Sequence, residues 1–465
     1  MSSEYVLPPA PARLFLVGIG GIGMSALAQL LRWQGYDIAG SDRGISEPGK
    51  AELYSKLRQQ GIRLYPQDGS GVRAETPQAL IVSAAVEEGN PDFEAGADVP
   101  RLHRAKALSQ ALGRIPGARL IAVGGTCGKT SVTGWLGSAL HALGERVLVV
   151  NGGYYADEQE LPGNFRADAN PTWLVVEVDE SDKSILSFEP DYGIVLNATN
   201  DHYGADEMRR VFGCFLENCR LGGVASRELA GIIPAHLQKH ALFNGEPCGD
   251  EGVISPAGYE SSRESIRFEV PGFGQVTTCQ AGRHSAANAC AVLALLSILG
   301  LKSSRSDLCR ALSAFRGIRQ RFEMMGSTSA GIPVVNDYAH NPEKISAALR
   351  TAHERFGNRI LAVFQPHGFT PLRKMRGELT QDLASLMKGT EDALALLPVY
   401  YAGGAVDFSP TSDEVAEEMA AAGIPVTACN RADVEKMAQG RTWDCILVMG
   451  ARDSSLREWC RTMVL

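Results

Sequence analysis

Residues 121–131 combine the residue types and the spacing of a loop that binds a nucleoside triphosphate. An apolar run at 121–123 leads into Gly-Gly-Thr-Cys-Gly-Lys-Thr-Ser, and a helical pattern follows. Glycines let backbone N–H groups close around phosphate oxygens, and the helix N-terminus adds a positive dipole. The strict loop has glycine at position 123, where this chain has valine, and glycines beside Lys and Thr also occur in ordinary turns. The residues predicted to surround the nucleotide are Gly125, Thr126, Gly128, Lys129, Thr130 and Ser131.

Lys129, Thr130 and Glu177 carry the chemistry that such a loop needs. Lys129 can reach the terminal phosphates, and the Thr130 hydroxyl can bind Mg²⁺. Glu177 ends the apolar strand pattern at 174–176, where a carboxylate can reach a metal held by the neighbouring loop. Three more carboxylates follow and fit a solvated acidic turn equally well, namely Asp179, Glu180 and Asp182.

A second glycine turn lies near the N-terminus. Gly18, Gly20 and Gly23 have the G-x-G-x-x-G spacing between an apolar run at 14–17 and a helical pattern at 24–33. Asp42 follows the next strand, where such folds place a carboxylate on a ribose hydroxyl. Alone, this motif predicts NAD(P) binding by a dehydrogenase. A dehydrogenase does not need a second loop for a triphosphate and Mg²⁺, whereas a ligase acting on a nucleotide-linked substrate needs both anion sites.

Length, composition and charge exclude several classes of protein. A chain of 465 residues is too long for one core and fits two to four domains, and 45% hydrophobic residues is ordinary for a globular protein. The net charge of −8 and the lack of a basic tract argue against nucleic acid or an anionic membrane as a partner. Neither a signal-like N-terminus nor a long apolar run is present, so we expect a soluble cytoplasmic protein.

The ten cysteines include no Cys-x-x-Cys pair. Several, such as Cys290 and Cys445, lie in apolar contexts, which favours reduced core residues. Cys127 is the exception, because a thiol at a helix N-terminus can have a lowered pKa. For Cys127 we expect incidental reactivity rather than catalysis.

Alternating strand and helix patterns predict an α/β protein of three domains. Residues 1–115 form a Rossmann-like domain that closes near a linker at 114–117. Residues 116–316 form a P-loop ATPase-like parallel sheet with strands at 173–178 and 192–196, loops and hairpins at 244–282 and a helix at 286–299. Residues 317–465 form another Rossmann-like, doubly wound sheet. Its expected strands lie at 333–335, 359–364, 393–397, 424–428 and 445–449, and its helices at 342–356 and 372–386.

The order of motifs along nearly the whole chain resembles that of the Mur ligases. The resemblance implies a three-domain enzyme of peptidoglycan precursor synthesis that uses ATP and Mg²⁺ to join L-alanine to UDP-N-acetylmuramate through an acyl phosphate. It implies the UDP substrate in the first domain, ATP and Mg²⁺ in the second and the amino acid in the third, in a monomer or homodimer. The matching segments are Gly18–Ser25, Ser41–Asp42, Gly125–Thr130, Glu177–Asp182, Asn197 with Asp201–His202, Gly282–His284 with Asn288, Arg321–Glu323, Asp337–Pro342 and Phe364–His367.

The resemblance also assigns roles to single residues of the ATP site. Glu177 resembles the metal-binding glutamate, and His202 resembles the histidine near a second metal, although a lone histidine is more often structural. Arg321 resembles an arginine that reaches the γ-phosphate from the third domain on closure, with a surface salt bridge as its alternative. Asn288 resembles an adenine contact.

The remaining roles concern the substrates. Asp337 and His340 resemble elements that contact the nucleotide ribose and the substrate. His367 follows an expected strand of the third domain, at the edge where such folds bind ligands. In the first domain the implied substrate contacts are Gly18, Gly20, Gly21, Ile22, Gly23, Asp42 and Ser83.

The chain departs from the family pattern around the expected acceptor site. Members that add L-alanine usually show Gln-Pro-His-Arg-Tyr-x-Arg, whereas residues 365–371 read Gln-Pro-His-Gly-Phe-Thr-Pro. Neither Gly nor Pro replaces a guanidinium that binds an anion. Arg373 and Lys374 are near in sequence, but helix geometry would place them differently. Ser285 stands where an adenine-site Asn is usual, and Arg452 stands where the family has Gly.

Two alternatives to this function stay open. A diverged Mur-type ligase would use another amino acid, a peptide or another sugar nucleotide. A non-catalytic nucleotide-binding paralogue is the alternative from a different class. The retained Lys129, Thr130, Glu177 and His202 argue against it, because a binding module has little use for a complete metal set.

Overall fold

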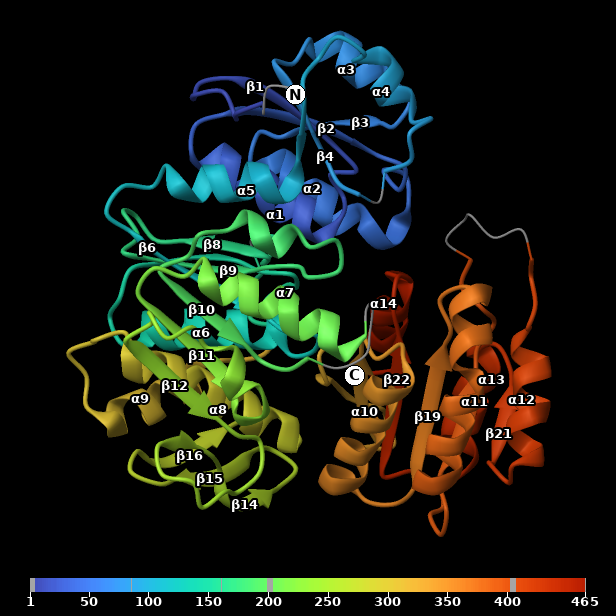
Figure 1. The fold of residues 1–465 in the computed structure, drawn as a ribbon. Coiled ribbons are helices and arrows are strands. Elements are labelled where there is room, and N and C mark those ends of the chain that lie inside the picture. The colour runs from blue at the N-terminus through green and yellow to red at the C-terminus, as the bar shows by residue number, and fades with distance from the viewer. Residues whose placement is uncertain (1–4, 85, 160, 199–203, 402–406, 465) are drawn as a thin grey trace. The chain divides into compact units, whose positions relative to one another are not determined.

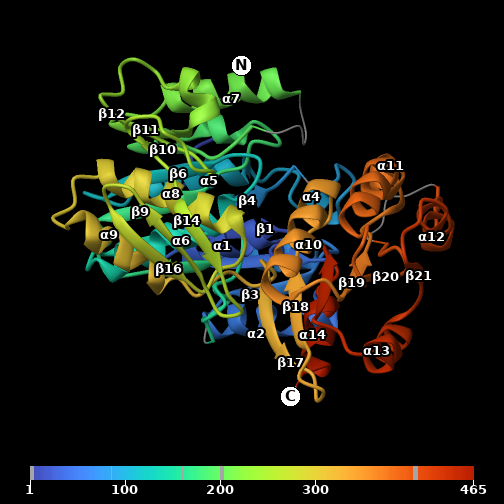
Figure 2. The same ribbon diagram turned by 90° about the horizontal axis from the view of Figure 1, so that it is seen from below.

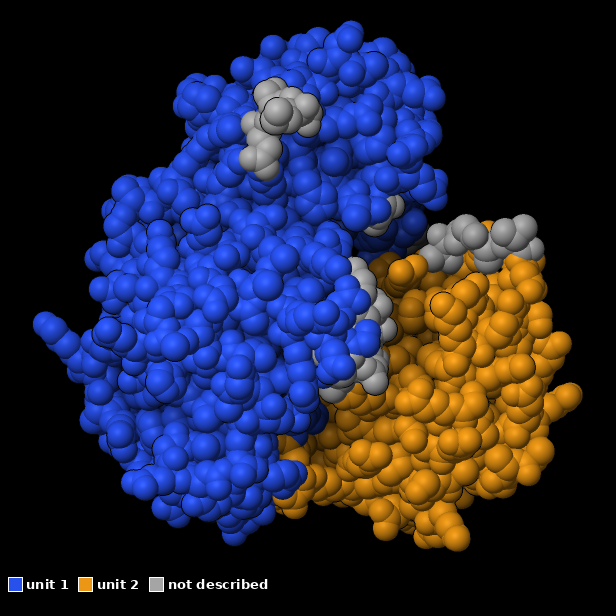
Figure 3. Space-filling view, viewed as in Figure 1, with its two compact units in different colours: residues 1–260, 267–279, 284–318 blue, residues 261–266, 280–283, 319–465 orange. Residues whose placement is uncertain are grey.

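The computed structural model describes residues 5–84, 86–159, 161–198, 204–401 and 407–464. The chain forms two compact units, coloured separately in Figure 3. Unit 1 comprises residues 1–260, 267–279 and 284–318, and unit 2 comprises residues 261–266, 280–283 and 319–465. Within the described ranges no helix is both long and apolar enough to cross a bilayer.

Unit 1 begins with a five-stranded, fully parallel sheet in the order β3-β2-β1-β4-β5. This order is that of a dinucleotide-binding half, as the first glycine turn predicts. The strands are β1 (Arg13–Val17), β2 (Asp37–Asp42), β3 (Arg63–Pro66), β4 (Ala79–Val82) and β5 (Arg101–His103). The helices are α1 (Ile22–Trp33), α2 (Ala51–Gln59), α3 (Ser70–Glu75), α4 (Pro91–Ala95) and α5 (Arg104–Gly113), with a 3-10 turn η1 (Pro48–Lys50).

The second sheet of unit 1 has the order β13-β12-β11-β10-β6-β9-β7-β8 and is parallel except for the pairing of β8 with β7. Its strands are β6 (Arg119–Gly124), β7 (Val147–Val150), β8 (Phe165–Ala167), β9 (Trp173–Glu177), β10 (Tyr192–Val195), β11 (Gly222–Ser226), β12 (Lys239–Phe243) and β13 (Val253–Ile254). The helical segments are α6 (Lys129–Ala142), η2 (Ser184–Ser187), α7 (Ala205–Glu217) and η3 (Arg227–Ile232).

A three-stranded sheet occupies most of the stretch where loops and hairpins are predicted. Its strands are β14 (Ala257–Ser261), β15 (Ile266–Val270) and β16 (Gly274–Thr278), and they are followed by α8 (Arg283–Ile298), α9 (Arg305–Ala311) and η4 (Leu312–Ala314). In Figures 1 and 2 these strands lie beside α9, which contacts β16.

One hydrophobic core joins the first two sheets of unit 1. It includes Leu27 and Leu31 of α1 together with Leu148 of β7 and Phe165 of β8. Polar groups also bridge the two parts, because buried Gln29 donates from Nε2 to Oδ1 of buried Asn164 over 2.8 Å. The predicted first and second domains therefore pack as one compact unit.

Helix α6 packs closely on the second sheet because small residues face it. A Cβ at Gly137 would lie 2.5 Å from Cγ2 of Val149, so only glycine allows this approach. Trp135 is 1% exposed and stacks on Phe315 with 5.2 Å between ring centroids. Its Nε1 donates to the Leu312 carbonyl over 2.9 Å. This packing holds the helix that follows the phosphate loop.

Unit 2 is a six-stranded sheet in the order β17-β18-β22-β19-β20-β21, parallel except for β17 against β18. The strands are β17 (Glu323–Ser327), β18 (Pro333–Asp337), β19 (Ile360–Gln365), β20 (Ala393–Leu396), β21 (Val426–Ala428) and β22 (Cys445–Gly450). The helices are α10 (Pro342–Phe356), α11 (Phe369–Leu386), α12 (Ser412–Ala421), α13 (Arg431–Gly440) and α14 (Ser455–Thr462).

The predicted α/β class with three mainly parallel sheets is confirmed, and several element ends differ from the prediction by one to three residues. Strand β21 begins two residues late, after Pro425, which has no amide proton to donate to the sheet. Helix α11 begins at Phe369 instead of 372, because a proline is tolerated in a first turn and Pro371 lies there. The residue limits of the three domains stay predictions.

All ten cysteines are free thiols, and five of them are buried as expected. Burial raises the pKa of the Cys460 thiol to about 12 and that of Cys309 to about 11. These thiols are therefore protonated at neutral pH. The buried set is Cys219, Cys290, Cys309, Cys445 and Cys460.

Trp135→Phe should destabilise unit 1 by about 1–3 kcal/mol, because it leaves a small void and a buried carbonyl without its donor. Thermal unfolding followed by circular dichroism measures this as a lower midpoint. Trp33→Phe is the matched control, since Trp33 is 41% exposed and should tolerate the change. Equal midpoints for the two variants would contradict the packing role of Trp135.

Candidate active site

Two glycines with positive φ form the loop between β6 and α6. Gly125 has a φ of +134° and Gly128 a φ of +88°, which L side chains rarely adopt. A Cβ at Gly125 would also lie 2.9 Å from the Cβ of Leu196. Val123 stands inside β6, paired with Ile194 of β10. The turn therefore begins only after the strand, and position 123 needs no glycine.

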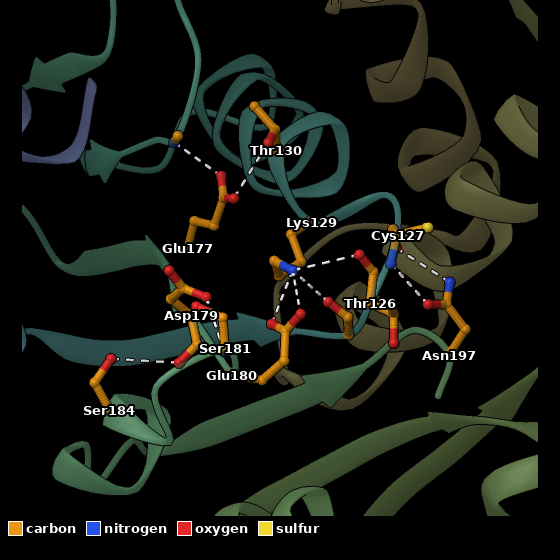
Figure 4. Close-up of polar contacts among 12 residues, drawn as sticks. Thr126, Cys127, Lys129, Thr130, Glu177, Asp179, Glu180, Ser181, Ser184 and Asn197 are labelled. Atoms are coloured by element: carbon orange, nitrogen blue, oxygen red, sulfur yellow. Dashed lines mark hydrogen bonds and ion pairs between the residues drawn. The ribbon is translucent and has the colours of Figure 1, made fainter. Parts of the chain in front are cut away.

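Lys129 begins α6 and turns back onto its own loop. Its Nζ donates to the Gly125 carbonyl over 2.6 Å and lies 2.8 Å from a carboxylate oxygen of Glu180 (Figure 4). Glu180 is 2% exposed, so a solvated acidic turn does not describe it. Burial raises the pKa of Glu180, and the ammonium of Lys129 opposes this shift. The loop thus holds a preformed, largely buried ion pair.

Thr130 and Glu177 meet at the carboxyl ends of two neighbouring strands. Strands β6 and β9 are parallel, with Val123 opposite Glu177. The Thr130 hydroxyl donates to Oε1 of Glu177 over 3.2 Å, and the N–H of Gly152 donates to Oε2 over 2.8 Å. The structure therefore brings together two of the three predicted metal ligands, with oxygen donors of the kind that Mg²⁺ prefers.

Two asparagines from other elements support the loop. Asn197, after β10, accepts from the Cys127 N–H at Oδ1 over 2.8 Å and donates to the Cys127 carbonyl over 3.1 Å (Figure 4). Asn288 of α8 lies against the loop, since a Cβ at Gly128 would be 2.9 Å from its Oδ1. The predicted adenine contact is therefore adjacent to the phosphate loop.

Asp42 holds the first glycine turn instead of facing outward. Its Oδ2 accepts from the Gly20 N–H over 2.8 Å, and its Oδ1 accepts from the Tyr54 hydroxyl over 2.9 Å and from the Gly44 N–H over 2.8 Å. Asp42 is buried. Gly20 must be glycine, because a Cβ would approach the Tyr54 hydroxyl to 2.4 Å. A direct ribose contact by Asp42 stays a prediction.

Arg104 connects the first glycine turn to the acidic segment after β9. It begins α5, and a Cβ at Gly23 would lie 2.1 Å from its Nη1. Its Nη2 lies 3.7 Å from Oδ2 of Asp179, and Nε2 of the preceding His103 lies 3.6 Å from Oδ2 of Asp182. The two predicted anion sites of unit 1 therefore share a network of charged side chains.

In unit 2, Asp337 organises the segment that carries Arg321. At the end of β18 its Oδ2 accepts from the Phe322 N–H over 2.6 Å, and its Oδ1 accepts from the Ala339 N–H over 2.7 Å. Burial raises the pKa of Asp337. Gln320 and Phe322 both have positive φ, at 59° and 48°. Such strain is typical of segments that position functional side chains.

His340 and His367 lie together at the carboxyl edge of the six-stranded sheet of unit 2. Their rings meet edge to face with 5.1 Å between centroids. Arg321 places its guanidinium 5.1 Å from the ring of Tyr338, which is also in contact with His340. The structure thus gathers Arg321, Asp337, His340 and His367 within unit 2.

The structure gives the positions of most of the remaining predicted residues but does not test the roles assigned to them. Ser83 follows β4, and its carbonyl accepts from the Val86 N–H over 3.2 Å. Ile22 begins α1 and Ser131 lies in the first turn of α6. His202 lies outside the described residues. Within the part of the chain that the structure describes, no three His, Cys, Asp or Glu side chains cluster as a metal site would require.

The sequence reasoning missed several supporting residues. Tyr54 and Arg104 contact the predicted site residues but lie in no motif. Asn197 lies in a segment that matches the family pattern, but its bonds to Cys127 were not predicted. Glu180 did carry a sequence signal, because, like Glu177, it lies close after an apolar strand pattern that neighbours the phosphate loop. Its burial could not be predicted, because Asp182, only two residues later in the same acidic segment, is exposed.

A cavity of about 630 Å³ lies elsewhere in unit 1. Its walls include Trp33, Arg114, Arg146 and Thr172. Arg146 and Thr172 directly precede β7 and β9, so the cavity lies at the amino edge of the second sheet, whereas the phosphate loop follows β6 at its carboxyl edge. It is therefore not the candidate active site.

Comparisons with known proteins agree with this geometry. The family pattern described as "Mur ligase family, catalytic domain" matches residues 14–115, and "Mur ligase, glutamate ligase domain" matches residues 320–452. A UDP-N-acetylmuramate–L-alanine ligase of Streptomyces avermitilis is 32% identical over 96% of both chains. One from Rhizobium etli is 31% identical over 85% of this chain and 84% of its own.

Solved structures show the same fold. The UDP-N-acetylmuramate-alanine ligase of Thermotoga maritima superposes with a TM-score of 0.78 and 28% identity, covering 97% of this chain and 98% of its own. A murein peptide ligase of Psychrobacter arcticus shares the fold at 19% identity, with a TM-score of 0.68 and coverage of 97% and 98%. On the sequence similarity and the fold together, the chain belongs to the Mur ligase family.

Proposed function

We propose that this protein is an ATP- and Mg²⁺-dependent ligase that joins L-alanine to the carboxylate of UDP-N-acetylmuramate in peptidoglycan precursor synthesis. The observation that carries the proposal is the convergence of Lys129, Thr130 and Glu177 on one glycine loop, in a chain whose full-length relatives bear this activity in their names. The UDP substrate would bind at the first glycine turn and the amino acid in unit 2.

The activation step draws on groups of unit 1. Lys129 would exchange the Gly125 carbonyl for the β- and γ-phosphates, and the loop N–H groups would hold the phosphate oxygens. Thr130 and Glu177 would hold Mg²⁺, and when bound the ion neutralises charge on the phosphates. The substrate carboxylate attacks the γ-phosphorus, the bond to the β-phosphate oxygen breaks, and acyl phosphate and ADP form.

The second step joins the amine. The amino nitrogen attacks the acyl carbon, a tetrahedral intermediate forms, and its collapse breaks the bond to phosphate and releases the amine proton. Catalysis of this kind depends on positioning and on charge neutralisation more than on covalent enzyme intermediates. Arg321 at the γ-phosphate, Asn288 at adenine, Asp337 at the ribose and His202 at a second metal remain parts of this proposal.

His340 is suited to receive the amine. Its Nδ1 lies 2.9 Å from the Tyr338 carbonyl, which only accepts, so Nδ1 carries the proton and Nε2 presents a lone pair. Burial, with Lys344, His367 and Arg321 as positive neighbours, lowers the pKa of His340 to about 4. A neutral imidazole accepts a hydrogen bond from the incoming ammonium without repelling it.

Phosphate release with a panel of acceptors tests the substrate assignment. Purified protein with Mg·ATP and UDP-N-acetylmuramate should release phosphate with L-alanine, and much less with glycine, other amino acids or peptides. Release with a different acceptor only would establish the diverged ligase. No release with any acceptor, while Mg·ATP still binds, would establish the non-catalytic paralogue.

Lys129→Ala should lower kcat/KM for ATP at least about 100-fold, as for loss of one electrostatic donor to a transition state. Lys183→Ala is the control, because this half-exposed lysine pairs with Glu207 on the surface and should leave the rate unchanged. Removing Lys129 alone leaves Glu180 buried without its cation. The double variant Lys129→Met with Glu180→Gln keeps the site neutral and should be folded but inactive. Activity in the double variant would overturn the role of Lys129.

His340→Gln should reduce the loss of stability in acid. The pKa of His340 is about 6.5 when unfolded and about 4 when folded, so between these values the unfolded chain binds more protons and stability falls as pH drops. At pH 5 the native protein should therefore lose on the order of 1–2 kcal/mol that the variant keeps. Unfolding midpoints at pH 8 and pH 5 measure the difference.

The control for this measurement is His141→Gln. His141 is exposed and pairs with Asp168 on the surface. Its replacement should therefore leave the change in unfolding midpoint between pH 8 and pH 5 as it is in the native protein. An acid dependence of His340→Gln identical to that of the native protein would show that His340 is not held neutral by its surroundings.

A further inference from the structure

Arg452 has a backbone conformation that glycine adopts freely and arginine rarely does. It follows β22 at the carboxyl edge of the six-stranded sheet of unit 2, with a φ of +69°. A non-glycine residue is strained in this region of backbone conformation, and such strain concentrates at ligand sites. The side chain is exposed. Glycine would adopt this conformation without strain, so the presence of a charged side chain here is consistent with a function for that charge.

The residues after Arg452 hold its backbone in place. Oδ1 of Asp453 accepts from the Ser455 N–H over 2.9 Å, and its Oδ2 accepts from Nη2 of Arg431 over 2.8 Å. The same Nη2 atom donates to the Ser455 hydroxyl over 2.9 Å. Asp453 is itself buried. The strained conformation of Arg452 is therefore imposed by the fold.

The sheet register puts Arg452 beside His367. Strands β19 and β22 are parallel neighbours, with Gln365 opposite Gly450, so both residues lie two positions beyond paired residues. The positive charge of Arg452 contributes, after burial, to the lowered pKa of His367. Among the described residues, the buried Nδ1 of His367 has no hydrogen-bond partner. An unpartnered ring nitrogen thus lies within electrostatic reach of the Arg452 guanidinium.

Two other arginines on this side of unit 2 are engaged elsewhere. Arg373, which follows the uncharged Gly368–Pro371 segment, lies 2.5 Å from Oδ2 of Asp407 and also donates to the Ser409 carbonyl. Arg376 lies 2.6 Å from Oε1 of Glu418. Arg373 therefore does not supply the charge that the 368–371 segment lacks.

We propose that Arg452 binds the α-carboxylate of the acceptor amino acid, with the adjacent His367 as its second polar contact and the amine directed to His340. An arginine presents two parallel N–H groups that match a carboxylate. The two histidine rings are in contact, so one small amino acid can span the distance between them. The assignment rests on the proposed ligase function and names the residue that recognises the acceptor.

The test compares L-alanine with L-alaninamide, which lacks the carboxylate. Arg452→Gly removes the cation and relieves the backbone strain, so the variant should fold with an unchanged or higher unfolding midpoint. Its KM for L-alanine should rise roughly 10- to 100-fold, the loss expected for a charged hydrogen bond. The KM values for ATP and UDP-N-acetylmuramate should not change. The preference of the native protein for L-alanine over L-alaninamide should disappear.

Three further variants define the outcome. Arg452→Lys keeps the charge without the fork and should fall between the native protein and Arg452→Gly. Arg373→Ala removes an engaged cation and should behave as native. If Lys374→Ala raises the KM for L-alanine and Arg452→Gly does not, the assignment is overturned in favour of Lys374. An unchanged preference for L-alanine in Arg452→Gly overturns it as well.

Calorimetry separates failure of this assignment from failure of the proposed function. Native protein loaded with a non-hydrolysable ATP analogue and UDP-N-acetylmuramate is titrated with L-alanine. Binding by the native protein that Arg452→Gly loses supports the assignment, even without phosphate release. Turnover of L-alanine with the same KM in Arg452→Gly overturns the assignment and leaves the ligase function standing. A native protein that neither binds nor consumes L-alanine overturns both.

Discussion

The parallel hydrogen bonding of β6 to β9 and β10 is the constraint on which the candidate active site depends. Parallel strands end at one edge of a sheet, so residues that follow them meet there even when they are distant in sequence. This brings Lys129 and Thr130 after β6, Glu177 at the end of β9 and Asn197 after β10 around one loop. The positive φ of Gly125 and Gly128 then allows the loop to close.

Charge in this site is paired or hydrogen-bonded before any ligand arrives. Lys129 lies between a backbone carbonyl and the buried carboxylate of Glu180, and Glu177 accepts hydrogen bonds from Thr130 and Gly152. Buried ion pairs add little to stability, because desolvation offsets their attraction. Their value here is preorganisation, since a cation already held at the loop needs little rearrangement to meet a phosphate.

Parallel strands also end at one edge of the sheet in unit 2, where β18, β19 and β22 end near Asp337, His367 and Arg452. Strained residues lie near two of these positions. Gln320 and Phe322 flank Arg321, and Arg452 itself has a positive φ. Asp337 accepts a hydrogen bond from the N–H of the strained Phe322, and Asp453, which follows Arg452, accepts one from the side chain of Arg431. The proposed acceptor site in unit 2 is therefore held in place by its surroundings, as the phosphate loop of unit 1 is.

The sequence by itself determined the α/β class, the two glycine turns and the family, because these depend on local spacing and on periodicity along the chain. It also named Lys129, Thr130, Glu177, His340 and His367 as candidates, because they lie inside motifs. Tertiary structure alone decided that Asp42 faces inward, that Glu180 is buried, that Asn197 holds the loop and that Arg373 is engaged by Asp407. Orientation, burial and pairing depend on residues dozens of positions away, and only the folded sheet brings those residues into contact.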